Sequence, residues 1–151
     1  MGINEIHETE NSIYIVMPYC NGGILNTDIR YPNIEYSDAE IFELFSALIE
    51  TLAELKAKNY MHRDIKPANI MFQKKNDLNS LMLIDLGMIH YRKGKKSPEY
   101  TKCGTPGYMA PEVINYKKGT PLYSTKCDVF SLGLVFYELI TGLQVFRGEN
   151  V

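Results

Sequence analysis

The sequence has few cysteines and no excess of charge of either sign. Its three cysteines, Cys20, Cys103 and Cys127, are odd in number and widely spaced, which argues against a disulfide framework and a cysteine metal site. Sixteen Lys and Arg residues nearly balance 18 Asp and Glu residues, so the formal net charge is −2. Because this balance gives no excess of positive charge, nucleic acid is not an expected partner.

Long apolar segments are also absent. Residues 129–140 form the most apolar stretch, but Ser131, Gly133 and Glu138 interrupt it and it is too short to cross a bilayer. Residues 1–11 carry three glutamates and no apolar run, unlike a signal peptide. No membrane partner and a cytoplasmic location are therefore expected. The 151 residues, 45% hydrophobic and 23% charged, suit one globular domain.

Hydrophobic periodicity predicts the elements of the first half. Residues 13–17 are β-branched and aromatic, which predicts a buried strand. A short helix is expected over residues 24–30. Ser37 and Glu40 have the spacing of a capping box. A stripe of apolar residues three, four and seven apart predicts a helix from Ser37 to about Asn59; it comprises Ile41, Leu44, Phe45, Leu48, Leu52 and Leu55.

The second half contains two short strands, an irregular loop and an apolar helix. Residues 70–72 and 81–84 are apolar runs whose polar link predicts a hairpin. Regular structure is not expected from residue 85 to 105, where the basic run at 92–96 is better explained as a solvated face than as a recognition site. Thr125 and Asp128 again have capping-box spacing. The helix that follows is apolar around most of its circumference, which predicts burial on all sides and an end at Gly142.

Residues suited to phosphate chemistry gather in the segment 62–69 and just after the second short strand. Asp64 is followed by Lys66 and Asn69 in one loop, and Asp85 comes 21 residues after Asp64. Phosphoryl transfer needs a carboxylate near the attacking hydroxyl, a cation near the moving phosphoryl group and oxygen ligands for Mg²⁺. These four side chains supply all three.

The motifs resemble those of the eukaryotic protein kinase superfamily, serine/threonine type. They are His62-Arg63-Asp64-Ile65-Lys66-Pro67-Ala68-Asn69, Asp85-Leu86-Gly87, the run from Cys103 to Glu112, and Asp128-Val129-Phe130-Ser131-Leu132-Gly133. The resemblance covers the chain from about Ile3 to Phe146, and the run from Cys103 to Tyr108 looks most like the calcium/calmodulin-dependent or related groups. It implies ATP- and Mg²⁺-dependent phosphorylation of Ser or Thr hydroxyls on a protein substrate.

The resemblance also implies an α+β fold with the organisation of a protein kinase. Residues 1–17 would be a remnant of the N-terminal β lobe, with two strands, and residues 18–23 the hinge. Residues 24–151 would be part of the helical C-terminal lobe, with the activation segment at 85–112.

Roles for the four central residues follow from the resemblance. Asp64 would orient the substrate hydroxyl and accept its proton, and Lys66 would neutralise charge on the transferring phosphate. Asn69 and Asp85 would hold Mg²⁺. Each residue also has an alternative, purely structural interpretation. These are, in chain order, a loop-capping aspartate, a solvated surface lysine, a turn asparagine and an aspartate that caps a strand end.

The resemblance assigns further residues to the nucleotide and the substrate. Met17, Pro18, Cys20 and Met71 would surround adenine, although both methionines also suit an ordinary core. Thr105 would begin the pocket for the residue after the acceptor.

Regulation and scaffolding involve a third set. Thr101 would carry a phosphate added by an upstream activating kinase, with Arg63 as its partner; the rival interpretation is an unmodified loop threonine. His62 would pack against Leu86, with Ile3 in the same stack, rather than act as a base. Asp128 would accept backbone N–H bonds from the catalytic loop.

The resemblance further implies parts that the chain lacks. A Gly-rich loop, a strand lysine and a helix glutamate would precede Ile3, and an arginine that pairs with Glu112 would follow Phe146. Glu112 is thus expected to be buried without its partner, at a cost of about 3–5 kcal/mol. We expect a fragment rather than a naturally short protein, with little or no transfer by the chain alone. The alternative function is a non-catalytic kinase-like interaction module.

Overall fold

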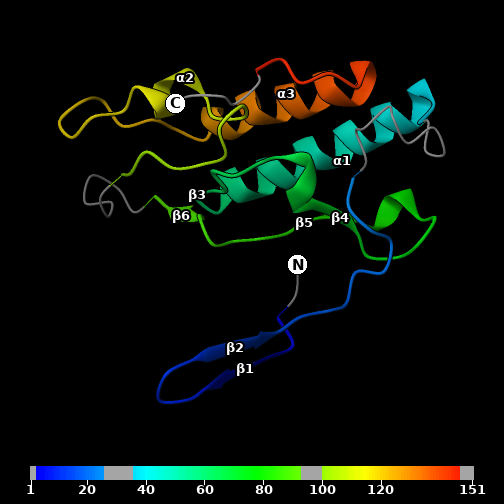
Figure 1. Cartoon of the computed structure of the whole chain (residues 1–151), viewed down its shortest axis with the longest axis horizontal. Helices are drawn as coiled ribbons and strands as arrows, with labels where there is room; N and C mark the ends of the chain where they lie inside the picture. Colours follow the sequence, from blue (N-terminus) through cyan, green and yellow to red (C-terminus); the bar gives the residue numbers. More distant parts are fainter. Residues whose placement is uncertain (1–2, 26–35, 93–99, 147–151) are drawn as a thin grey trace.

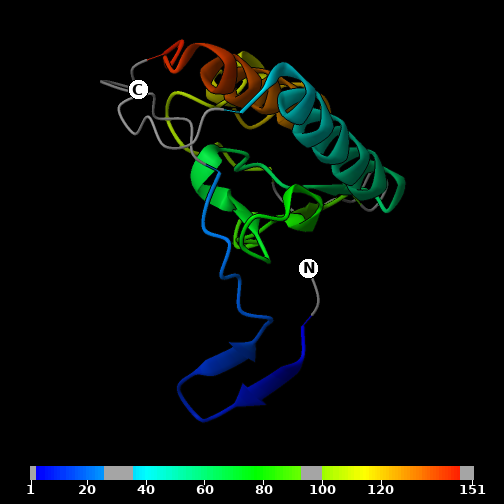
Figure 2. The same ribbon diagram turned by 90° about the vertical axis from the view of Figure 1, so that its right-hand side faces the viewer.

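The computed structural model describes residues 3–25, 36–92 and 100–146. In chain order the elements are β1 (Glu5–Glu8), β2 (Ile13–Val16), α1 (Asp38–Ala57), β3 (Tyr60–Met61), η1 (Pro67–Asn69), β4 (Ile70–Phe72), η2 (Leu78–Ser80), β5 (Leu81–Leu83), β6 (His90–Tyr91), α2 (Pro111–Ile114) and α3 (Lys126–Thr141). Helices α1 and α3 lie side by side, whereas the β1–β2 hairpin stands apart (Figures 1 and 2). Among the described helices, none has the length and apolar character to cross a membrane.

Helix α1 begins at the predicted capping box. The Ser37 hydroxyl accepts the Glu40 N–H at 3.4 Å, and the Glu40 carboxylate accepts the Ser37 N–H at 2.8 Å. Leu44 and Leu48 on the apolar stripe are buried. The helix ends at Ala57, two residues before the expected Asn59, which has a positive φ of 62°.

Helix α3 is buried on one side only, so the prediction of burial all round is wrong. Leu132 and Val135 are in the core, but Val129 and Ile140 are 60% and 57% exposed. A helix can be apolar on every side, yet within the described residues only the side facing α1 and the segment at residues 100–113 has packing partners. The helix ends at Gly142 in the left-handed conformation, as predicted.

The capping box predicted at the start of α3 does not form. Thr125 is itself helical and makes no side-chain cap hydrogen bond. The Asp128 carboxylate instead accepts two backbone N–H groups from the distant segment at residues 62 and 63. The spacing of Thr125 and Asp128 suits a capping box, but the Asp128 carboxylate is bonded to another part of the chain.

Strands β4 and β5 form the predicted antiparallel hairpin, with Met71 opposite Met82. The extended segment before Leu25 lies along β4, where the Gly22 N–H bonds the Phe72 carbonyl at 3.0 Å. A Cβ at Gly22 would come within 2.5 Å of Phe72 Cβ, so this close approach requires glycine. The short helix expected at 24–30 lies mostly outside the described residues; within them Ile24 bridges to Met71.

One strand pair escaped the sequence analysis. In β3–β6, Tyr60 lies opposite Tyr91 and Met61 opposite His90, and only β6 falls within residues 85–105, where no regular structure was expected. Two residues are too few to show an alternating pattern. Most of the basic run that follows lies outside the described residues.

The β1–β2 hairpin exists, but its predicted burial is wrong. From Ile13 to Val16 the side chains are between 65% and 42% exposed. The hairpin forms a two-stranded sheet of its own, and no other described element covers either face.

The core consists of two clusters, and the segment 62–69 links them. Met61, directly before this segment, belongs to a cluster with Tyr100, Val113 and Tyr123. Ile65 within it and Ile70 after it belong to the larger cluster, which contains Leu44, Leu48, Leu132 and Val135. The segment is therefore anchored in packed structure at both ends.

Candidate active site

The Asp128 carboxylate fixes the start of the loop at residues 62–69. Its two oxygens accept the backbone N–H groups of His62 and Arg63 at 2.9 and 2.8 Å. Burial raises the pKa of Asp128, and these two hydrogen bonds oppose the rise. Arg63 has a positive φ of 70°, an uncommon conformation for a non-glycine residue, and the two bonds hold the backbone there.

His62 is a neutral structural residue in this arrangement. Its ring is fully buried, and Nε2 lies 3.1 Å from the Ile84 carbonyl while Nδ1 lies 3.3 Å from the Asp64 N–H. A carbonyl can only accept and an N–H can only donate, so Nε2 carries the proton. Burial lowers the pKa of His62, which keeps the ring neutral. Leu86 is partly exposed, and its predicted packing against His62 stays a prediction.

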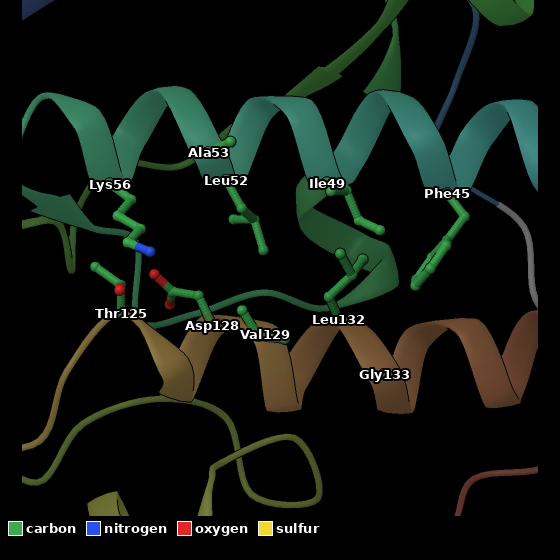
Figure 3. A pocket seen from close by; sticks show the side chains of 10 residues that line it. All are labelled: Phe45, Ile49, Leu52, Ala53, Lys56, Thr125, Asp128, Val129, Leu132 and Gly133. Atoms are coloured by element: carbon green, nitrogen blue, oxygen red, sulfur yellow. The ribbon is translucent and has the colours of Figure 1, made fainter.

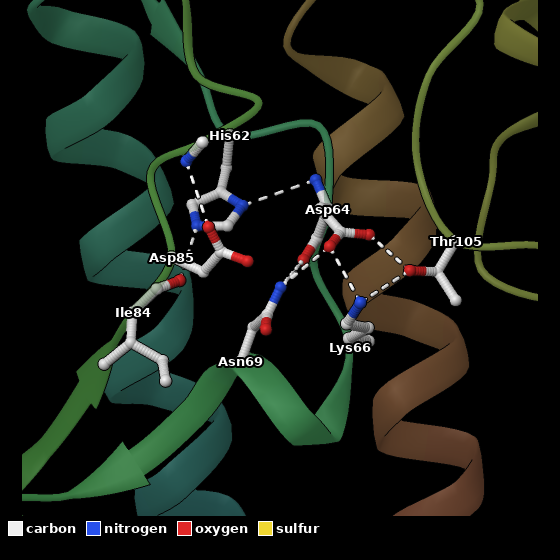
Figure 4. A network of polar contacts seen from close by, with 8 residues as sticks. His62, Asp64, Lys66, Asn69, Ile84, Asp85 and Thr105 are labelled. Carbon is white, nitrogen blue, oxygen red and sulfur yellow. Dashed lines mark hydrogen bonds and ion pairs between the residues drawn. The ribbon is translucent and has the colours of Figure 1, made fainter. Parts of the chain in front are cut away.

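Three side chains converge on Asp64, which is buried (Figure 4). The Thr105 hydroxyl donates to Oδ1 at 2.6 Å, and the Lys66 ammonium pairs with Oδ2 at 2.9 Å. Asn69 Nδ2 donates to Oδ2 at 2.9 Å and to the Asp64 carbonyl at 2.8 Å. Burial raises the pKa of Asp64, but hydrogen bonds from Thr105, Lys66 and Asn69 outweigh it, so the pKa is lowered and the carboxylate is ionised at neutral pH.

Thr105 joins the segment at residues 100–110 to this network. Its hydroxyl donates to Asp64 and accepts from Lys66 Nζ at 2.7 Å. The preceding Gly104 has φ 127°, and a Cβ there would lie 3.0 Å from the Arg63 carbonyl and 2.8 Å from Met109 Cγ. Glycine thus allows the segment to approach the loop closely enough for Thr105 to reach Asp64.

Replacing Thr105 by Ala should lower kcat by about tenfold, because Asp64 and Lys66 lose the hydroxyl that holds them together. Thr105→Ser keeps the hydroxyl and should retain most of the activity. Steady-state phosphoryl transfer, the activity expected from the sequence, measures the difference between the two variants. Equal losses in Ala and Ser variants would show that the hydroxyl is not what matters.

Asn69 and Asp85 are the two residues expected to hold a metal ion. Both Asp64 atoms that contact Asn69 are hydrogen-bond acceptors, so the side-chain nitrogen Nδ2 of Asn69 faces Asp64. The side-chain oxygen Oδ1 is the amide atom that is not bonded to Asp64. The backbone carbonyl of Asn69 accepts the Ile84 N–H at 2.9 Å, which places the residue before Asp85 beside Asn69. Asp85 has φ 60°, and its exposed carboxylate accepts the Gly87 N–H at 3.1 Å (Figure 4).

This donor set fits Mg²⁺. One carboxylate and one amide oxygen suit an ion that keeps several waters and binds substrate phosphates. Among the described residues no group of three or more His, Cys, Asp or Glu side chains forms a metal cage. A Zn²⁺-type site is therefore not indicated in that part of the chain.

The residues expected at the nucleotide are only partly brought together. Cys20 Sγ lies 3.3 Å from Met82 Sδ, and Met82 is opposite Met71 in the hairpin, so the segment after Pro18 touches these strands. Met17 is 44% exposed. Glu112 is exposed, which corrects the expectation of a buried and unpaired carboxylate. The penalty predicted for it does not arise, since water solvates its charge.

Thr101 and Arg63 are neighbours. Arg63 Nη1 lies 3.5 Å from the Thr101 hydroxyl, and the Thr101 side chain is exposed. His90 lies in the same region: its ring contacts that of Tyr100, and its buried Nε2 has no partner among the described residues. Burial and the charges of Arg63 and Arg92 lower the pKa of His90, so two cations are close to it.

Sequence reasoning missed the groups that tie Tyr108 to α3. The Tyr108 hydroxyl donates to the Glu138 carboxylate, and the Ser131 hydroxyl donates to the Tyr108 carbonyl at 2.7 Å. Burial and the Glu138 charge raise the pKa of Tyr108. Glutamate in an apolar helix was the available signal, since a buried carboxylate needs a partner.

A separate pocket of about 380 Å³ lies between α1 and α3 (Figure 3). Its apolar lining comes from both helices and includes Phe45, Ile49, Leu52, Val129 and Leu132. Its polar lining residues, Lys56, Thr125 and Asp128, gather at one end. The two Asp128 oxygens there already accept backbone N–H groups of the loop at residues 62 and 63, so the network around Asp64 and not this pocket is the candidate active site.

Comparison with known proteins decides the family. Residues 1–151 match the family model described as the protein kinase domain. The chain belongs to the protein kinase family. Relatives include serine/threonine-protein kinase DCLK3 of Mus musculus, 35% identical over 98% of this chain and 18% of that protein. Probable serine/threonine-protein kinase 2 of Plasmodium falciparum is 34% identical over 96% of this chain and 27% of that protein. This kinase chain therefore spans less than a third of the length of either relative.

A solved structure agrees on the fold of the kinase chain. The structure described as the yeast RNA Pol II CTD kinase CTDK-1 complex aligns with a TM-score of 0.79 and 27% identity, over 98% of this chain and 46% of that one. The predicted α+β fold of the protein-kinase type is confirmed, as is the serine/threonine type of the family. Protein kinases as a family use ATP and Mg²⁺ and act on protein substrates.

Proposed function

We propose that this kinase domain transfers the γ-phosphoryl group of ATP to serine or threonine hydroxyls of a protein substrate, with Asp64 as catalytic base. The observation that carries this proposal is the convergence of Lys66, Asn69 and Thr105 on the Asp64 carboxylate. A carboxylate held by three donors is fixed in position and ionised, as the acceptor of a hydroxyl proton must be.

The residues divide the reaction among them. The substrate oxygen bonds to the γ-phosphorus as the bond to the β–γ bridging oxygen breaks, and the hydroxyl proton passes to Asp64. Lys66 uses two of its three N–H groups on Asp64 and Thr105, which leaves one to offer to the transferring phosphoryl group. Asn69 Oδ1 and the Asp85 carboxylate would hold Mg²⁺, which when bound neutralises phosphate charge.

We assign the adenine to the hinge segment and the hairpin beside it. Pro18 has no N–H and offers only its carbonyl, which suits an amino group. Cys20 would contribute its backbone groups, while Met17 and Met71 would supply apolar contacts. We also propose a cytoplasmic location, a compartment that supplies ATP.

A direct assay of the full-length protein that carries these residues tests the proposal. Purified protein is incubated with γ-labelled Mg·ATP and a basic Ser/Thr peptide, with Asp64→Asn as the control. Label on the peptide with wild type but not with the variant supports the proposal. Nucleotide binding without transfer would instead favour a non-catalytic kinase-like module.

Thr101 is proposed as an activating phosphorylation site for an upstream kinase. A phosphate there would form charge-assisted bonds with Arg63, whose Nη1 already lies 3.5 Å from the hydroxyl. Arg63 and Arg92 both act on His90, whose buried Nε2 has no hydrogen-bond partner among the described residues. Thr101→Ala should lower the activity of fully phosphorylated protein by about tenfold or more, through loss of those bonds. Phosphopeptide mass spectrometry and initial rates measure this. Phosphatase treatment that slows wild type and the Ala variant equally would contradict it.

A further inference from the structure

The Tyr123 hydroxyl lies between the activation segment and the arginine that precedes Asp64. It donates to the Thr101 carbonyl at 2.7 Å and accepts from Arg63 Nη1 at 3.1 Å. Tyr123 is 4% exposed and lies just before α3. One phenol thus contacts two segments that are far apart in the sequence.

The ring of Tyr123 is held by packing independently of its hydroxyl. Its centroid lies 4.8 Å from that of Tyr100 and 5.5 Å from that of Tyr116, both in edge-to-face contact. Burial raises the pKa of Tyr123 to about 12, although the hydrogen bond from Arg63 opposes the rise. The hydroxyl therefore keeps its proton at neutral pH and donates a hydrogen bond to the Thr101 carbonyl.

Arg63 is fixed at its other atoms as well. Its Nε donates to the Met88 carbonyl at 2.7 Å, and its backbone N–H donates to Asp128 at 2.8 Å. The Tyr123 hydroxyl is thus the contact that joins the guanidinium to the Thr101 backbone, while Thr101 Oγ1 lies at the longer distance of 3.5 Å. Four residues after Thr101, Thr105 donates to Asp64.

We propose that Tyr123 is a positioning residue for phosphoryl transfer. Its hydroxyl holds the Thr101 backbone against Arg63, so that the segment leading to Thr105 stays in register with Asp64. This inference rests on the proposed function, because Asp64 must be the catalytic base for the register to matter. Tyr123 contacts neither substrate nor metal.

The test compares Tyr123→Phe with Tyr116→Phe in the full-length protein. Both variants keep the aromatic cluster, but only the first loses a hydroxyl that bonds Thr101 and Arg63. Tyr123→Phe should lower kcat by about threefold to tenfold, as expected for one hydrogen bond, whereas Tyr116→Phe should leave kcat within about twofold of wild type. Thermal unfolding of both variants shows whether each is folded at the assay temperature.

A second readout does not depend on activity. Lys102 is exposed and follows Thr101, so trypsin should cut after Lys102 several times faster in Tyr123→Phe than in wild type or Tyr116→Phe. Unchanged kcat and unchanged cleavage in folded Tyr123→Phe would overturn the inference. Equal loss of kcat in both Phe variants would also overturn it, since packing alone would then explain the effect. If wild type shows no transfer, the proposed function fails, and the trypsin comparison still decides whether Tyr123 holds Thr101.

Discussion

Asp64→Asn is expected to lower kcat by a factor of about 10²–10⁴, the usual contribution of general base catalysis. The amide keeps the shape of the carboxylate but cannot accept the hydroxyl proton. It also removes the charge that pairs with Lys66 at 2.9 Å. Steady-state transfer to a Ser/Thr peptide at saturating Mg·ATP measures the loss. The KM for ATP should change little, because Asp64 acts on the acceptor side of the reaction.

Asp38→Asn is the matched control for this substitution. Asp38 lies in the exposed first turn of α1, and the change removes the same charge far from the loop. It should leave kcat close to that of wild type. A comparable loss of activity in both variants, or full activity in Asp64→Asn, would contradict the role of Asp64.

Asp85→Asn is expected to weaken Mg²⁺ binding by about 10²-fold or more, because a site with one carboxylate loses its only formal charge. The exposed Asp85 carboxylate makes one backbone hydrogen bond, to Gly87, so the variant should fold. Titrating transfer activity against Mg²⁺ measures the shift of the midpoint to higher concentration. At very high Mg²⁺ part of the activity should return.

The two aspartate variants should differ in kind and not only in size. Asp64→Asn should be slow at every Mg²⁺ concentration with an unchanged midpoint, whereas Asp85→Asn should move the midpoint. An unmoved Mg²⁺ midpoint in Asp85→Asn would show that Asp85 is not a metal ligand. Identical behaviour of both variants would mean that the two carboxylates do not have separate roles.

The sequence predicted the elements that depend on local pattern. Helix α1, with its Ser37–Glu40 capping box, and the β4–β5 hairpin formed where periodicity placed them. The kinase fold was predicted from four motifs that follow one another in the order expected for a protein kinase. Within each motif the spacing of the residues can be read directly from the sequence. The grouping around Asp64 was expected on the same basis.

What the sequence could not predict depends on tertiary partners. Thr125 and Asp128 have the spacing of a cap, but only the fold shows that the carboxylate binds the loop at residues 62 and 63 instead. The burial of α3 and β2 was overestimated because apolar character does not say whether a neighbour is present. Tyr123 had no local signal, since its partners are 22 and 60 residues away.

The most direct test is a crystal structure of the full-length protein with Mg²⁺ and a non-hydrolysable ATP analogue. We expect the Asp85 carboxylate and Asn69 Oδ1 to coordinate Mg²⁺ at about 2.0–2.1 Å, with the Lys66 ammonium next to the terminal phosphate. Asp64 should remain free of the metal, still bonded to Thr105. Nucleotide bound away from these four side chains, or a metal that contacts neither Asp85 nor Asn69, would contradict the assignment of phosphoryl transfer to this site.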